Sequence, residues 1–174
     1  NIGTPITYTE DLNMRSPLPT NLGFGSSIEL GKDESNSISF HMELNKLLVP
    51  TNPILEGDSV VLGKEYPSIV VKGMFVSFFD APGIEYADGT YSSVFREEMA
   101  EITVSMGLEY KFENKIYFRT GYFYESQVKG NRDYISFGVG LTSPVIVNIA
   151  YIISLNITGS PYTNTAQISL GYKF

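Results

Sequence analysis

The strongest constraint on the fold of this chain is an alternation of apolar and polar residues that recurs in seven segments. In the last one, TAQISLGYKF at 165–174, every second residue is apolar and the residues between are small or polar. A period of two places one set on each face of a β-strand. The same period predicts six further strands, at 22–30, 38–45, 102–112, 116–125, 135–142 and 145–156, although Ile146 and Ile152 blur the pattern in the last of these.

The length of these strands and their polar faces favour a membrane. Most run for about 10 residues, as a tilted membrane strand requires, whereas strands of soluble proteins average nearer 5 or 6. Their polar faces carry Gly, Ser, Thr and charges, which suits a wet or tightly filled lumen better than the core of a soluble β-sandwich, the alternative interpretation. No apolar run of about 18 residues is present for a helical span. We therefore predict an all-β fold, an antiparallel transmembrane β-barrel of a bacterial outer membrane.

The amino-acid composition argues against several classes of function. The chain has no cysteine, which excludes disulfides, thiolate catalysis and cysteine-ligated metals. Its net charge of −7 argues against a nucleic-acid partner. The single histidine, His41, shares a polar face with Glu43, and two such groups make a poor metal site. We expect His41 to form hydrogen bonds in a lumen, and we predict a protein that is not an enzyme and uses no metal or cofactor.

The connections between the predicted strands differ in length on the two sides. If the last strand ends on the periplasmic side, the short turns at 31–36, 113–114 and 142–144 are periplasmic. The longer connections at 126–132, 156–164 and 49–97 are then external, the asymmetry typical of outer-membrane barrels. Seven strands leave the first segment on the outer side, whereas bacterial barrels are even-stranded. We therefore expect 1–174 to be a single barrel segment, about half a barrel, unless residues near 4–10 add a strand.

The connection at 49–97 is too long to be a simple link, so we treat it as an extracellular loop insertion. Pro50 and Pro53 end the preceding strand. The apolar stretch 68–79 is compatible with a short amphipathic helix or an additional strand. Asp80-Ala-Pro-Gly83 predicts a turn. Ser93 followed by 96–101 predicts a short helix with Glu97 and Glu98 in its first turn, where the helix dipole favours anions.

Inward-facing charges form a candidate lumen lining. We consider that they either line a permeation path or form an ion-paired plug that fixes strand register, and we favour the plug because unpaired buried charge is costly. These residues are Glu43, Glu109, Lys111, Arg119 and Glu125.

Four stretches of the chain resemble the PorV family, a FadL-like group of outer-membrane barrels that belongs to the type IX secretion system of Bacteroidetes. They are LNKLLVPTNP at 44–53, KGMFVSFFDAPG at 72–83, REEMAEI at 96–102, and RTGYFYES and KGNRDYISFGVGL within 119–141. The resemblance implies a 14-stranded barrel, of which seven strands would be the C-terminal half.

The resemblance also implies partners. Family members bind the C-terminal domain of secreted cargo at the translocon barrel and shuttle it to the cell-surface attachment complex. There a sortase with a catalytic cysteine trims the cargo and links it to lipopolysaccharide. The alternatives are a FadL-type channel for hydrophobic small molecules and a purely structural barrel that seals a larger translocon.

We expect the partner-binding surface to lie in the loop 49–97, because strand residues are committed to lipid or lumen. An apolar cluster rimmed by charge is a plausible docking surface for a β-rich cargo domain. The candidate partner-binding residues are Phe75, Phe78, Phe79, Asp80, Pro82, Gly83, Glu97 and Glu98.

Overall fold

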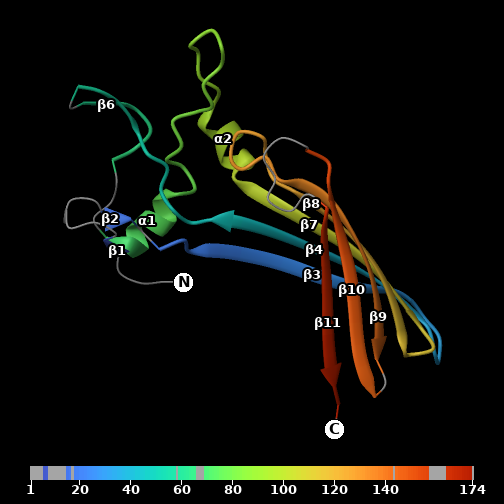
Figure 1. Cartoon of the computed structure of the whole chain (residues 1–174). Helices are drawn as coiled ribbons and strands as arrows, with labels where there is room; N and C mark the ends of the chain where they lie inside the picture. Colours follow the sequence, from blue (N-terminus) through green and yellow to red (C-terminus); the bar gives the residue numbers. More distant parts are fainter. Residues whose placement is uncertain are drawn as a thin grey trace. The chain divides into compact units, whose positions relative to one another are not determined.

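A seven-stranded antiparallel sheet is the main element of the chain (Figure 1). The structure, a computed structural model, describes residues 6–7, 15–16, 18–57, 59–65, 69–142, 144–156 and 164–173. The strand order is β11-β10-β9-β8-β7-β4-β3. The strands are β3 (Asn21–Lys32), β4 (Ser37–Leu47), β7 (Ile102–Phe112), β8 (Ile116–Tyr124), β9 (Asp133–Thr142), β10 (Val145–Ser154) and β11 (Thr165–Tyr172).

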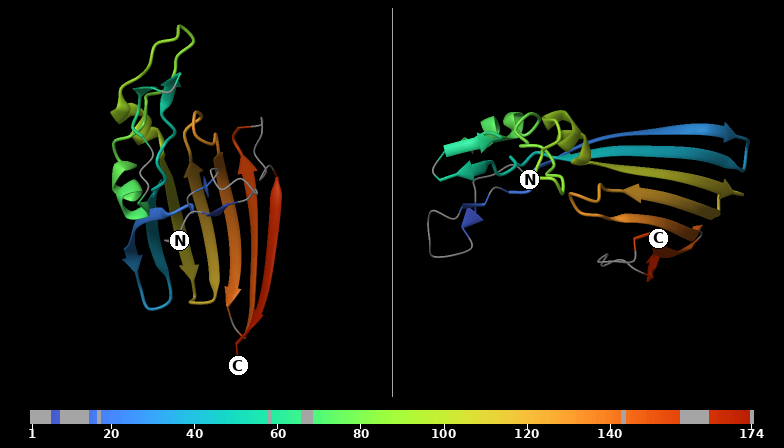
Figure 2. Two further views of the ribbon diagram at one scale, coloured as in Figure 1. Left: turned by 90° about the vertical axis from the view of Figure 1, so that its left-hand side faces the viewer. Right: turned by 90° about the horizontal axis from the view of Figure 1, so that it is seen from above.

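This arrangement confirms the all-β prediction and each of the seven predicted strands. As expected, β3 lies next to β4 and the last five strands follow one another as a meander, visible side by side in Figure 2. The sheet is open within the described residues, with β3 and β11 at its edges. Phe174 and most of the connection 156–164 lie outside the described residues.

Short turns join the hairpins of the sheet. Between β7 and β8, Glu113 and Asn114 adopt positive φ angles of 48° and 55°. Between β3 and β4, the Asp33 carboxylate accepts hydrogen bonds from the backbone amides of Ser35 at 2.8 Å and Asn36 at 2.5 Å. These local contacts fix the pairing of neighbouring strands, and pairing sets which side chains lie opposite one another.

The chain divides into two compact units. One, which we call the sheet unit, comprises 24–44 and 103–174 and holds most of the sheet. The other, which we call the loop unit, comprises 1–23 and 45–102. The loop unit contains helices α1 (Val70–Val76) and α2 (Val94–Ala100) and the hairpin of β5 (Ile54–Glu56) and β6 (Ser59–Leu62).

The loop unit answers two questions that the sequence left open. Within the predicted stretch 68–79, Val70–Val76 form a helix, α1, rather than an additional strand, and residue 68 lies outside the described residues. Near the N-terminus, β1 (Ile6–Thr7) pairs with β2 (Arg15–Ser16) in a separate two-stranded sheet, so it adds no strand to the seven-stranded sheet. The predicted helix after Ser93 is confirmed as α2. The hairpin β5–β6 was not predicted.

The exposure of the sheet is the reverse of that in a soluble domain. Along β7, Met106, Leu108, Tyr110 and Phe112 are exposed, whereas the small and polar residues between them are half-buried. In the central strand β9, Phe137 is 52% exposed while Gly140 on the opposite face is buried. Across the described residues, the buried apolar side chains are those of Leu48, Pro50, Ala81 and Pro82, and all four belong to the loop unit. The described helices include none long and apolar enough to cross a membrane.

Candidate functional site

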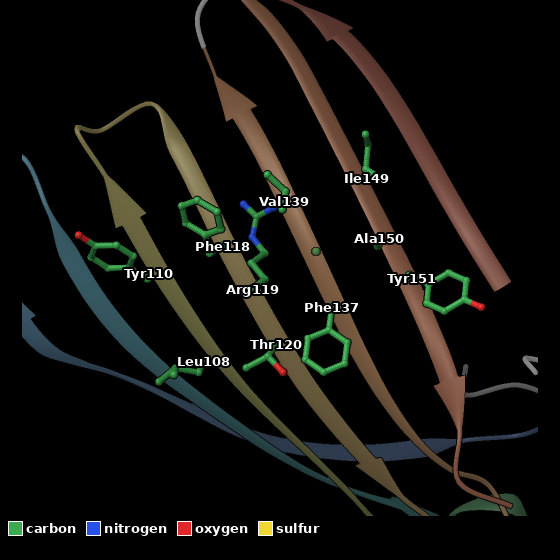
Figure 3. A pocket seen from close by; sticks show the side chains of 11 residues that line it. Leu108, Tyr110, Phe118, Arg119, Thr120, Phe137, Val139, Ile149, Ala150 and Tyr151 are labelled. Atoms are coloured by element: carbon green, nitrogen blue, oxygen red, sulfur yellow. The ribbon is translucent and has the colours of Figure 1, made fainter. Parts of the chain in front are cut away.

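The apolar face of the sheet unit forms a continuous surface across several strands. Strand register sets Phe118 of β8 opposite Val139 of β9, which in turn lies opposite Ile149 of β10. The rings of Tyr110 and Phe118 are stacked across β7 and β8 with centroids 6.4 Å apart. Side chains from these four strands line a shallow groove of about 530 Å³ (Figure 3). This face consists of large aliphatic and aromatic groups, with little polar surface.

The opposite face of the same strands carries a polar network, which we call the polar ladder. The Arg119 Nε donates to Glu109 Oε2 at 2.6 Å, across the β7–β8 pair. One guanidinium NH₂ group, Nη1, donates to Asn148 Oδ1 at 3.0 Å, and Asn148 in turn reaches the Ser169 hydroxyl at 3.4 Å. The ladder therefore links β7, β8, β10 and β11.

The ladder crosses β9 without a side chain from that strand, because Gly140 occupies the crossing point. A Cβ atom built on Gly140 would lie 2.5 Å from Asn148 Oδ1 and 3.0 Å from Arg119 Nη1. Arg119 also lies 4.8 Å above the Tyr117 ring, and Lys111 lies 5.7 Å from the same ring. Two of the five predicted lumen charges, Glu109 and Arg119, thus form one ion pair.

Two further predicted lumen charges, Glu125 and Glu43, lie apart from the ladder. Glu125, at the end of β8, makes a bidentate contact with Arg132, with distances of 2.6 and 2.9 Å. Arg132 in turn lies 5.5 Å from the Phe123 ring. This cluster ties together the two ends of the connection between β8 and β9. Glu43 lines a separate polar groove with His41 on the face of β4 and its neighbours.

Within the loop unit, helix α2 holds the turn that follows α1. The Ser93 hydroxyl caps α2 by accepting from the Arg96 amide. From this helix, Glu97 accepts from the Gly83 amide at 2.6 Å. Glu98 accepts from the amides of Asp80 at 3.0 Å and Ala81 at 3.1 Å. The acidic pair therefore binds the backbone of the turn instead of facing outward.

A buried lysine neutralises part of this acidic cluster. Lys46, near the end of β4, is 7% exposed. Its Nζ contacts Glu98 Oε2 at 2.8 Å and Glu101 Oε2 at 2.5 Å. The other Glu101 oxygen accepts from the Thr51 hydroxyl at 2.9 Å. One cation thus bridges two carboxylates in the interior of the loop unit.

Asp80 is the third carboxyl group of this cluster. It is 1% exposed, and its Oδ2 accepts from the Thr51 amide at 2.8 Å. Its Oδ1 is buried and has no hydrogen-bond partner among the described residues. Burial raises the pKa of the Asp80 carboxyl to about 6, and the negative charges of Glu98 and Glu101 contribute to the rise against the opposing Thr51 hydrogen bond.

Helix α1 exposes its large apolar side chains. Gly73 and Ser77, one turn apart, are buried, and a Cβ atom on Gly73 would lie 3.3 Å from Pro50. Phe75 and Phe79 are 70% and 68% exposed, and Val71 shares their face. We call Val71, Phe75 and Phe79 the α1 stripe. Val71 and Phe75 are four residues apart and lie on one face of α1 (Val70–Val76), and Phe79 follows in the turn after the helix ends.

The predicted partner-binding residues therefore separate into two groups. Phe75 and Phe79 lie on the surface, flanked by Lys64, whose Nζ is 6.0 Å from the Phe79 ring. Phe78 is half-buried, with Lys46 Nζ 5.7 Å from its ring. Asp80, Pro82, Gly83, Glu97 and Glu98 are all buried. The structure thus places the acidic pair inside the loop unit, which differs from the expected charged rim.

Sequence reasoning did not find Lys46 or Glu101. Met42, Leu44 and Lys46 are two residues apart from one another, so all three lie on one face of the strand. A lysine on an otherwise apolar face was therefore the sequence signal that could have identified Lys46. A lysine in such a position needs a buried counter-charge. In the described part of the chain, no group of three or more His, Asp or Glu side chains is arranged to hold a metal ion.

Fold and site together define an antiparallel β-sheet protein with an exposed apolar face, a polar opposite face and a separately folded loop unit. No family model matches the chain, and no curated protein matches it.

Proposed function

We propose that the sheet unit is part of a transmembrane β-barrel in a bacterial outer membrane. The observation that carries this proposal is the reversed exposure of the sheet, with aromatic and aliphatic side chains outside and Gly, Ser and charged residues on the more buried face. Burying apolar surface stabilises by about 25 cal/mol per Å², so an apolar sheet face in water would forgo that stabilisation. Contact with lipid removes the free-energy cost of exposing this apolar face to water. Alternation of apolar and polar residues along strands is also typical of membrane barrels.

The open sheet edges support a barrel that is completed by further strands. Hydrocarbon offers no hydrogen-bond partner to the backbone groups along β3 and β11, so an open edge is not tolerated there. We propose that strands from upstream sequence or from another chain pair with both edges. The 14-stranded barrel implied by the resemblance would place them upstream.

We further propose that the protein is a non-enzymatic subunit of the type IX secretion machinery. In this proposal it binds the C-terminal domain of secreted cargo at the translocon and shuttles it to the attachment complex. The resemblance to the PorV family supports this function. The loop unit provides a fitting surface, because the α1 stripe exposes large apolar groups directly before a turn whose Asp80 amide Glu98 of α2 binds, and Lys46 contacts Glu98 in turn. Exposed apolar patches of this kind mark interaction sites.

The polar ladder weighs against the alternative, a channel for hydrophobic small molecules. Such a channel needs an apolar path along the lumen. On the described strands, the polar face instead carries an Arg–Glu ion pair extended by Asn148 and Ser169. Transfer of an apolar ligand along this face would bring it against charged groups, which favours the shuttle over the channel.

The docking role of the α1 stripe is tested by replacing Phe75 and Phe79 together with Ser. Because both side chains are exposed, the substitution should leave the barrel and the loop unit folded while co-purification with cargo domain or translocon falls at least tenfold. Phe95→Ser is the matched control, since Phe95 is 71% exposed on α2 of the same unit. Normal partner binding by the double variant, with assembly in the membrane intact, would show that recognition lies elsewhere.

A further inference from the structure

The buried carboxyl cluster of the loop unit carries more negative charge than its cation neutralises. Three carboxyl groups, Asp80, Glu98 and Glu101, meet one ammonium group, that of Lys46. Lys46 contacts both glutamates directly, and each glutamate also accepts hydrogen bonds from backbone or hydroxyl donors. Asp80 Oδ2 accepts from the Thr51 amide, and within the described part of the chain its second oxygen is buried without a partner. The charge that lacks compensation therefore falls on Asp80.

We propose that this cluster is a proton-controlled latch, which holds the turn 80–83 against α2 when Asp80 is protonated and loosens it when Asp80 ionises. An ionised carboxylate in this position keeps an unpaired oxygen next to two anions, which costs free energy. Protonation removes one negative charge without disturbing the bonds that Glu98 makes to the turn. Loosening is the alternative way to relieve the repulsion, because it returns the carboxylate to water.

Every element packed around Asp80 contributes to this balance. Helix α2 and its C-cap supply Glu98 and Glu101, and β4 supplies Lys46. The connection after β4 supplies the Thr51 amide and hydroxyl. Glu97 holds the neighbouring Gly83 amide, and the turn after β6 brings Gly63 against the Asp80 carbonyl. Lys64, next to Gly63, lies over the Phe79 ring.

The direction of the pH effect follows from the sign of the shift. The pKa of Asp80 rises from its ordinary 3.8 to about 6 in the closed loop unit. A raised pKa means that the closed form binds the proton more tightly than the open form. This proton binding stabilises the closed form fully below pH 4, and the stabilisation is lost as the pH rises through about 6. With these two values, linkage predicts that the equilibrium constant for opening increases about tenfold between pH 5 and pH 7.

Amide hydrogen exchange of the full chain in a membrane-mimetic micelle tests the latch. After correction for intrinsic exchange rates, the segment 77–83 should open about tenfold more readily at pH 7 than at pH 5. Asp80→Asn keeps an acceptor for the Thr51 amide and removes the titration, so its exchange should not change between these pH values. Asp88→Asn is the matched control. In that exposed turn, hydrogen bonds from the Thr90 hydroxyl and amide hold the pKa of Asp88 below its ordinary value, so the variant should keep the wild-type response.

Equal protection of 77–83 at both pH values in the wild type would overturn the latch, as would a tenfold change that persists in Asp80→Asn. If that variant does not fold, carbon-13 titration of the wild-type Asp80 carboxyl by NMR decides, with an inflection near 6 in support and one near 4 against. The latch stands on the loop unit alone. An effect of the latch on partner docking, through the α1 stripe that precedes the turn, rests on the proposed function. The exchange experiment needs no partner, so it tests the latch independently of that function.

Discussion

Gly140 occupies the point at which Arg119 crosses β9 to reach Asn148. At this position a side chain competes directly with the polar ladder, since a Cβ atom would approach both Arg119 Nη1 and Asn148 Oδ1. Gly107, on the same polar face in β7, has its nearest neighbour 3.8 Å from a built Cβ atom. The two glycines therefore have different roles, one required by a hydrogen-bond network and one tolerant of a methyl group.

We predict that Gly140→Ala lowers the free energy of unfolding by about 1–3 kcal/mol, because it displaces Arg119 and leaves polar groups of the ladder without partners. Gly107→Ala should change it by no more than about 0.5 kcal/mol, as is usual for substitutions that meet only ordinary contacts. Denaturant unfolding in micelles or bilayers measures both. Similar losses for the two variants would show that the ladder does not depend on the gap at Gly140.

The sequence predicted the face on which each ladder residue lies but not the network itself. Alternation alone placed Glu109 and Arg119 inward, and the short turn after Phe112 brought them opposite one another. The contact from Arg119 to Asn148 skips a strand, so it depends on sheet order and on the missing side chain at Gly140. Likewise, the cluster of Lys46 with Glu98 and Glu101 joins residues about 50 positions apart, which no local pattern specifies.

At the scale of the elements, strands were easier to predict than the loop unit. A strand that is apolar on one face leaves a period of two in the sequence, so all seven long strands were found. Helix α1 is apolar on several faces and buries its small residues, so its sequence fits a helix and a strand equally well. The hairpin β5–β6 is short, and its turn is marked only by Gly57, with φ +60°.

The proposal that one face of the strands contacts lipid predicts a difference between neighbouring residues. Phe137→Arg should make folding into the bilayer less favourable by about 2–4 kcal/mol if residue 137 lies near the midplane, because a charge on the lipid face is costly. Ser136→Arg, on the polar face of the same strand, should cost much less, since that face contains charged and hydrogen-bonding groups. Folding into lipid vesicles, followed by heat-modifiable migration in gels, compares the two. Equal tolerance of arginine at both positions would contradict the assignment of the faces.

At the scale of the whole molecule, the two edges of the sheet differ from its centre. All residues of β3 and nearly all of β11 are exposed on both faces, whereas β9 alternates between exposed and half-buried or buried positions. The central strands obtain their order from neighbours on both sides. The edge strands depend on pairing that the described residues do not supply, which makes them the part of the sheet most sensitive to additional strands.

We therefore predict that the backbone amides of β3 and β11 that point away from β4 and β10 exchange rapidly in the isolated chain 1–174 and become protected when upstream strands are supplied. The physical reason is that only paired backbone groups are stable in hydrocarbon, so barrel closure must satisfy both edges at once. Amides of β9 serve as the internal control, because they are paired on both sides and should be protected in either sample. Strong protection of these outer amides of β3 and β11 in the isolated, monomeric chain would mean that these residues close on themselves, and the proposal of a half-barrel would then be wrong.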